Sequence, residues 1–247
     1  MAGPRLSVNV NKVATVRNAR GGAVPSVLDA VRVCLDAGAL GITVHPRADR
    51  RHITPTDVRE VAALLAPARA RVELNIEGDP RPDLLDLVHE VRPHQCTLVP
   101  VRDGEITSQA GWTAQAAGTS LTRVVRDLKA AGIRVSLFID ADEDAALWAA
   151  QTGADRIEIY TEPFARSFEH SPSAAGRAFE RCAQTAEAAH TLGLGVNAGH
   201  DLDLSNLALF RTLPHLREVS IGHALISRAL FVGLHRSVFD FLEVLAG

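Results

Sequence analysis

Eight short segments of the chain alternate Val, Ile or Leu with polar residues, and helix-like segments separate them. The eight segments read LSVNVN (6–11), GITVH (41–45), VELNIE (72–77), QCTLV (95–99), VSLFID (135–140), RIEIY (156–160), LGVN (194–197) and EVSIG (218–222). Strands that are joined by helices pair in parallel, and parallel strands covered on both faces are normally apolar throughout. The polar alternate positions therefore indicate that one face of this sheet is polar.

Two folds give such an alternation. A half-exposed antiparallel sheet is its usual source, but hairpins do not need a helix between every two strands. A closed (β/α)8 barrel, the TIM barrel, with a polar lumen accounts for both the alternation and the helices. The pattern favours this α/β barrel.

Helical periodicity falls where the crossovers of a barrel are needed. Helices are predicted over 25–35, 55–65, 82–91, 121–131, 143–151, 173–192, 204–213 and 224–245. Longer connections are predicted over 11–24, 47–54 and 100–120. The first of these carries Arg17 and Arg20, and it is either a basic lid that swings over the barrel mouth or an ordinary solvated loop.

Composition narrows the class of protein. A length of 247 residues with 47% hydrophobic content fits one barrel domain over 1–247. A net charge of −3 gives no bulk electrostatic reason to bind nucleic acid or a membrane surface. Cys34, Cys96 and Cys182 are far apart and show neither disulfide nor zinc spacing. With no leader-like or membrane-spanning apolar run, we expect a soluble cytoplasmic protein.

Reactive side chains stand at the ends of several segments, where barrel enzymes carry their active sites. His45 is followed within seven residues by Arg47 and His52, a set that suits a phosphate, although a lone strand-end histidine is often structural. Glu77 would be buried there, and burial raises a carboxyl pKa toward that of a general acid or base. A salt bridge to an arginine is the alternative for Glu77.

The last two segments end in glycine-histidine turns, which point to a phosphorylated ligand. His200 and Asp201 follow the seventh segment, and Gly222 and His223 open the last helix, whose N-terminus favours anions. Lys12, just after the first segment, is a Schiff-base candidate, a phosphate ligand or simply exposed. No HxH or HExxH spacing predicts a metal.

Seven motifs in this order resemble those of the pyridoxine 5′-phosphate synthase family. They are VNVNKVATVRNARGG, GITVHPRADRRHI, LNIEG, TLVP with EIT downstream, VSLFID, VNAGHDL and VSIGHALI. The resemblance implies a (β/α)8 barrel with additional helices, assembled as a homo-octamer of four dimers. It also implies the condensation of 3-amino-2-oxopropyl phosphate with 1-deoxy-D-xylulose 5-phosphate, with no metal or redox cofactor.

The same resemblance assigns roles to residues. His45 and Glu77 would accept protons and His200 would donate one. The residues implied to hold substrate are Asn9, Asn11, Lys12, Arg20, Arg47, His52, Thr107, Asp201, Gly222 and His223. Asn9, the backbone of Asp201 and the Gly222-His223 turn would hold the amino-ketone phosphate. Arg47, His52 and Thr107 would contact the deoxyxylulose phosphate, and Arg20 would lie over both substrates.

Two positions depart from the family pattern. Asn11-Lys12 replaces the usual Asp-His pair, and Asp201 stands where glycine is common. The Asn-Lys pair still donates hydrogen bonds and a positive charge to phosphate. The alternatives to the synthase are a barrel aldolase or lyase with a Schiff base on Lys12, and a barrel that only binds a sugar phosphate. Three proton-transfer groups argue against mere binding.

Overall fold

A closed barrel of eight parallel strands, in chain order, forms the centre of the computed structural model, which describes residues 3–100 and 110–247. The strands are β1 (Arg5–Asn9), β2 (Gly41–Val44), β3 (Glu73–Gly78), β4 (Gln95–Leu98), β5 (Arg134–Ile139), β6 (Arg156–Tyr160), β7 (Gly195–Gly199) and β8 (Leu216–Ile221). The barrel closes where Arg5 to Val8 of β1 pair with Glu218 to Ile221 of β8. The predicted (β/α)8 barrel is thereby confirmed, and the half-exposed antiparallel sheet is excluded.

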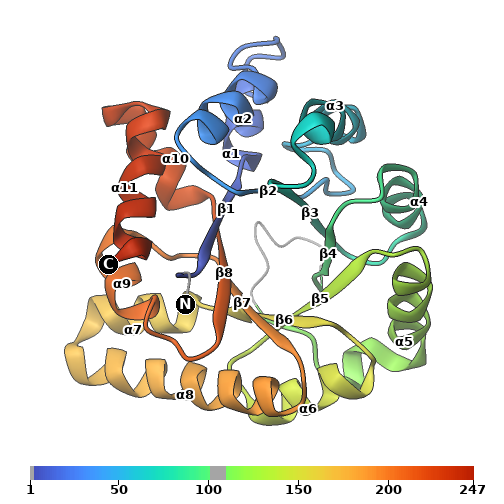
Figure 1. Cartoon of the computed structure of the whole chain (residues 1–247), viewed down its shortest axis with the longest axis vertical. Coiled ribbons are helices and arrows are strands. Elements are labelled where there is room, and N and C mark those ends of the chain that lie inside the picture. The colour runs from blue at the N-terminus through green and yellow to red at the C-terminus, as the bar shows by residue number, and fades with distance from the viewer. Residues whose placement is uncertain (1–2, 101–109) are drawn as a thin grey trace.

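Helices surround the barrel on its outer side (Figure 1). They are α1 (Asn11–Asn18), α2 (Val27–Asp36), α3 (Pro55–Leu65), α4 (Pro82–Val91), α5 (Ala114–Ala130), α6 (Glu143–Gln151), α7 (Glu162–His170), α8 (Pro172–Thr191), α9 (Leu204–Phe210), α10 (His223–Val232) and α11 (Leu234–Ala246), with a 3₁₀ turn, η1 (Ala66–Ala68). None of the helices in the described part of the chain is long and apolar enough to cross a bilayer. The prediction of one domain over 1–247 stays a prediction.

The predicted helices over 55–65, 82–91 and 143–151 match the structure residue for residue. Four other predictions were wrong. The connection predicted over 100–120 is shorter, because α5 begins at Ala114 and not at 121. The connection over 11–24 is not all loop, because its first eight residues form α1. Residues 162–170, for which no helix was predicted, form α7. The single helix predicted over 224–245 is two helices, because Gly233, with a φ of 84°, ends α10 before α11 begins.

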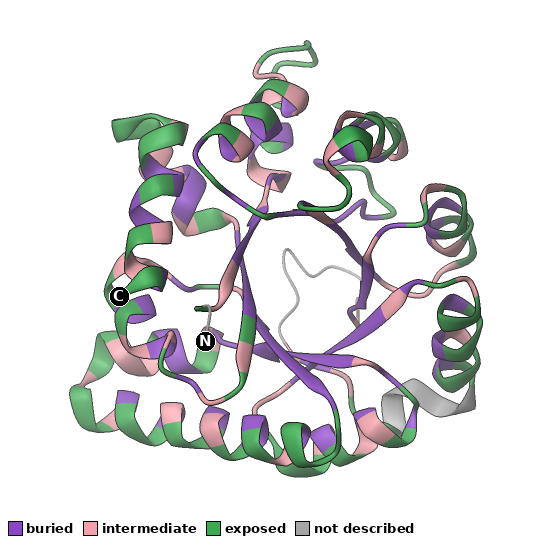
Figure 2. Cartoon of the chain, in the orientation of Figure 1, coloured by how far each residue is buried: buried purple, intermediate pink, exposed green. Residues whose placement is uncertain are grey.

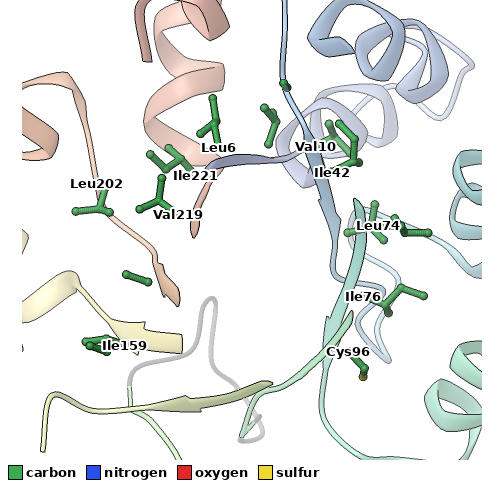
Figure 3. Close-up of a cluster of buried hydrophobic side chains, with 14 of the residues drawn as sticks. Leu6, Val10, Ile42, Leu74, Ile76, Cys96, Ile159, Leu202, Val219 and Ile221 are labelled. Carbon is green, nitrogen blue, oxygen red and sulfur yellow. The ribbon is translucent and has the colours of Figure 1, made fainter. Parts of the chain in front are cut away.

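The aliphatic residues of the strands point outward and pack against the helices. Leu6, Ile42 and Ile76 are at most 1% exposed and lie between the strands and the helix ring (Figure 3). Where burial is described, the helices bury mainly the side that faces the barrel and leave the other side to solvent (Figure 2). The main hydrophobic core is therefore a shell between barrel and helices.

Polar side chains fill the lumen, as the alternation predicted. The Ser7 and Thr43 hydroxyl oxygens lie 2.7 Å apart. Asn75 donates to Thr43 at 3.4 Å, and Thr97 donates to Asn75 at 3.0 Å. Because each of these residues comes from a different strand, the hydrogen bonds run around the inside of the barrel.

Charged residues close the N-terminal end of the lumen. Glu73 lies 2.7 Å from a guanidinium nitrogen of Arg5 and also pairs with Arg134. Arg134 donates to the Gln95 side chain at 3.0 Å, and Arg156 donates to Asn197 at 3.2 Å. This layer, which we call the basal network, occupies the end of the barrel opposite the mouth.

Candidate active site

Glu77, at the C-terminal end of β3, is the centre of the candidate site. It is 3% exposed, and its carboxylate accepts from Asn9 of β1 at 3.4 Å and from Ser220 of β8 at 3.3 Å. Burial, offset in part by the Ser220 hydroxyl, raises the pKa of Glu77 to about 7. No arginine pairs with it among the described residues, so the predicted buried carboxyl group, and not the salt bridge, is present.

His45 follows β2 and faces Glu77. Its Nδ1 lies 3.8 Å from a carboxylate oxygen of Glu77. Burial, then the charges of His52 and Arg47, lower the pKa of His45 well below its usual value. Both shifts disfavour the charged forms, so the two side chains do not form a full ion pair. The buried Nε2 of His45 has no hydrogen-bond partner in the described part of the chain.

Asn11 holds the backbone of His45. The Asn11 side-chain oxygen accepts from the His45 amide at 3.0 Å, and the Asn11 amide donates to the Asn9 side chain at 3.0 Å. An aspartate at position 11 would offer the same acceptor. The departure from the family pattern at this position therefore preserves the contact.

A second histidine, His52, and the positive charges of Arg47 and Arg81 lie near His45. The rings of His45 and His52 are 6.3 Å apart, and Arg47 and His52 are each only 8% exposed. The Ile53 amide donates to Nδ1 of His52, which leaves the proton of the neutral ring on Nε2. Burial, then the charges of Lys12 and Arg47, lower the pKa of His52 to about 4. Neutral His52 is thus a hydrogen-bond donor beside fixed positive charge.

His200 and Asp201 follow β7 with left-handed backbone, at φ 73° and 43°. The rings of Phe138 and Tyr160 lie 5.1 and 5.8 Å from the His200 imidazole. Burial lowers the pKa of His200. The charge of Asp201 acts to raise this pKa, and the charge of Lys12 acts to lower it further. The charge of His200 in turn lowers the pKa of His45, so the two histidines belong to one site.

Asn9 lies against the start of α10. A Cβ on Gly222 would fall 3.1 Å from the Cβ and backbone oxygen of Asn9, so the two backbones approach closely. Gly222 is the N-cap of α10, and His223 is its first residue. The free amide groups of this helix end favour an anion beside the Asn9 amide.

Sequence reasoning gave Glu158 no role, although it belongs to the polar positions of β6. Glu158 is 2% exposed, and burial, together with the charges of Glu77 and Glu218, raises its pKa well above the usual value. A Cβ on Gly199 would lie 2.2 Å from the Glu158 carboxylate, so this carboxylate packs directly against the backbone of β7. The site thus holds a second buried carboxyl group with a raised pKa, which the polarity of β6 alone could have suggested.

Three predicted features lie apart from this cluster or beyond the description. Thr107 lies outside the described residues. Arg20 is exposed in the turn after α1. Arg17 is not part of a swinging loop, because its guanidinium forms two hydrogen bonds with Asp57 of α3, at 2.5 and 2.9 Å. Within residues 3–100 and 110–247, no three His, Cys, Asp or Glu side chains are grouped as metal ligands.

Solved structures with low sequence identity share the fold. Phosphoribosyl anthranilate isomerase from Thermotoga maritima superposes with a TM-score of 0.60 at 14% identity, over 97% of this chain and 98% of its own. The enzyme of the same name from Thermus thermophilus gives 0.58 at 13% identity, over 98% of each chain. These similarities support the barrel fold but no particular function.

Comparison of sequences goes further. The family described as "Pyridoxal phosphate biosynthesis protein PdxJ" matches residues 6–247. Proteins named pyridoxine 5′-phosphate synthase from Bacteroides fragilis and Christiangramia forsetii are each 50% identical over 242 residues, covering 98% of this chain and 99% of theirs. One from Leptospira biflexa is 47% identical over 252 residues, covering 98% of this chain and 97% of its own. The chain therefore belongs to the PdxJ family.

Proposed function

We propose that this chain is a pyridoxine 5′-phosphate synthase, which condenses 3-amino-2-oxopropyl phosphate with 1-deoxy-D-xylulose 5-phosphate and releases phosphate and water. The observation that carries the proposal is Glu77. A buried carboxyl group with a pKa of about 7, 3.8 Å from a neutral histidine, is suited to move protons at neutral pH.

We assign proton transfer to three side chains. Amine addition to a ketone, loss of water and phosphate, and ring closure each require a proton to be taken from one atom and given to another. His45 and Glu77 are the acceptors, since burial leaves the imidazole neutral and the carboxyl near its midpoint. His200, on the opposite side of the mouth, is the donor. All three act where water is largely excluded.

Substrate phosphates bind at two places. The first lies at the start of α10, where Asn9 and the Gly222-His223 turn meet, and holds the amino-ketone phosphate together with the backbone at Asp201. The second lies beside Arg47, His52 and Lys12 and holds the deoxyxylulose phosphate. Arg20 and Thr107 are assigned to substrate by their motifs alone.

Incubation with both phosphates tests the proposal. Purified protein is expected to form pyridoxine 5′-phosphate and to release inorganic phosphate in equal amounts, followed by chromatography and a phosphate assay. A folded preparation that yields neither product would disprove the assignment. Borohydride added with the substrates is expected to leave Lys12 unmodified, whereas a stable adduct on Lys12 would indicate an aldolase.

We propose further that the protein assembles with copies of itself, as a homo-octamer, in the cytoplasm. Leu230 and Phe231, at the end of α10, are 72% and 89% exposed, and Phe239 of α11 is 41% exposed. Exposed apolar groups of this size favour a protein interface. Light scattering after gel filtration is expected to give the mass of eight chains, and Phe231→Glu is expected to lower it. The three buried free cysteines suit a reducing compartment.

A further inference from the structure

Backbone geometry sets His200 apart from the other residues of the site. Both His200 and the next residue have positive φ, at 73° and 43°, although neither is glycine. Side chains crowd the backbone in this region, so such residues persist only where neighbouring groups hold them. Something in the fold must therefore fix the turn that carries the imidazole.

Thr161, directly after β6, supplies the contacts. Its hydroxyl lies 2.7 Å from the carbonyl oxygen of Gly199 and also donates to the carbonyl oxygen of His200. Its amide donates to the same Gly199 oxygen at 3.1 Å. Thr161 is fully buried. One side chain thus binds the two consecutive carbonyl groups that precede and follow the strained φ.

The imidazole itself is held only by packing. Phe138, fully buried, and Tyr160, 6% exposed, contact it at ring distances of 5.1 and 5.8 Å, with interplanar angles of 51° and 87°. In the described part of the chain, no hydrogen bond reaches either imidazole nitrogen of His200. The direction of these nitrogens is consequently set by the backbone beneath the ring.

We propose that Thr161 is a positioning residue for His200, whose hydroxyl holds the turn after β7 so that the imidazole faces the substrates. The inference rests on the proposed function, because it takes His200 to be the proton donor. Thr161 does not touch the reacting atoms. It acts by fixing where His200 presents its nitrogens, and misplacement of a catalytic group by about 1 Å costs on the order of 10²-fold in rate.

Two substitutions separate the hydroxyl from the volume of the side chain. Thr161→Val keeps the shape and removes the donor, whereas Thr161→Ser keeps the donor. We expect kcat to fall about 10- to 100-fold in T161V, with both KM values within about threefold of wild type. T161S should retain kcat within about threefold. Equal losses in the two variants, or full activity of T161V, would overturn the proposal.

A second readout does not depend on turnover. Histidine labelled with ¹³C at Cε1 reports the titration of His200 by NMR, assigned through His200→Gln. The groups that act on His200 are Asp201, Lys12, His45 and Tyr160. These are unchanged in T161V, so a freed ring that gains water should titrate closer to the ordinary pKa of histidine. An unchanged titration in T161V would contradict the inference, even if the wild-type protein made no product.

If T161V does not fold, Thr161→Cys replaces it. A thiol is a weak hydrogen-bond donor of similar size. We expect kcat of the cysteine variant to lie about tenfold below that of the serine variant. Equal kcat values for these two variants would also overturn the proposal.

Discussion

At the scale of single residues, Glu77 shows how function and stability compete. Its carboxyl group is buried and receives two long hydrogen bonds, at 3.3 and 3.4 Å. Ionisation is therefore costly, and this cost is what keeps the group able to accept a proton near neutral pH. A tighter set of donors would stabilise the carboxylate and weaken it as a base.

Glu77→Gln should slow turnover by about 10²-fold or more while leaving substrate binding largely intact, because the amide keeps the shape and loses the transferable proton. The limb of the pH profile near the pKa of about 7 should disappear. Steady-state kinetics over a range of pH, with calorimetric binding, measures both. Glu90→Gln, on the exposed face of α4, is the control and should match wild type. Wild-type turnover of E77Q would remove Glu77 from the mechanism.

The same substitution should stabilise the fold at alkaline pH. The pKa of Glu77 is higher in the folded chain than its usual 4.5, so the folded state binds more protons between pH 4.5 and about 7. This favourable contribution is complete below pH 4.5 and is lost as pH rises through 7. We expect the Tm of E77Q to exceed that of wild type at pH 8.5, with a smaller difference at pH 5.5. Thermal melts that show the opposite order would contradict the raised pKa.

The sequence was informative about residues that become candidates for the site simply because they stand at the end of a strand. His45, Glu77 and His200 could be singled out as candidates because each is a titratable residue at the end of a strand-like segment. Thr161 and the contact of Glu158 with Gly199 could not. Their roles depend on the register between β6 and β7, which pairs Glu158 with Asn197 and Tyr160 with Gly199.

At the scale of elements, α1 depends on a contact that lies 40 residues away. Only Val13 and Ala14 of α1 are buried, so its sequence carries little helical periodicity. Arg17 of α1 bonds twice to Asp57, which also caps α3 through Thr54. A helix that tertiary contacts hold in place is easily mistaken for a loop, whereas α3, with its proline and capping box, is evident from sequence alone.

Arg17→Met should weaken this docking. Loss of two charge-assisted hydrogen bonds is expected to cost about 1–3 kcal/mol in the free energy of unfolding. The KM for deoxyxylulose phosphate should also rise, since Asn11 and Lys12 begin the same helix. Urea unfolding and steady-state kinetics measure the two effects. Arg32→Met, which removes an exposed pair with Asp29 on α2, should change stability by less than about 0.5 kcal/mol.

At the scale of the whole molecule, the two ends of the barrel have separate tasks. The mouth carries the residues to which we assign proton transfer, whereas the basal network ties β1, β3, β4 and β5 together. In barrels of this class, residues at the N-terminal end serve stability. Changes to the basal network should therefore alter unfolding without altering the reaction.

Glu73→Gln tests this division. Burial acts to raise the pKa of Glu73, but hydrogen bonds and charges from Arg5 and Arg134 outweigh it and lower this pKa. The ionised Glu73 therefore stabilises the fold above its usual pKa, and this stabilisation is lost as the pH falls. At pH 7 the substitution should cost about 1–3 kcal/mol in unfolding free energy. The loss should shrink toward pH 4, and kcat should stay within about twofold of wild type. A large fall in kcat with unchanged Tm would place Glu73 in the reaction instead.

The hydrogen-bonded lining of the lumen also bears on how the protein responds to temperature. Barrel interiors of this class are commonly filled with branched aliphatic side chains, whereas this one contains hydroxyls, amides and charges, among them Ser7, Thr43, Asn75 and Thr97. Exposure of polar surface lowers the heat capacity of unfolding, and exposure of apolar surface raises it. Scanning calorimetry should therefore give a heat-capacity change of unfolding, per residue, below the usual ~12–15 cal/mol/K. The stability curve would be correspondingly broad, with slow loss of stability on cooling.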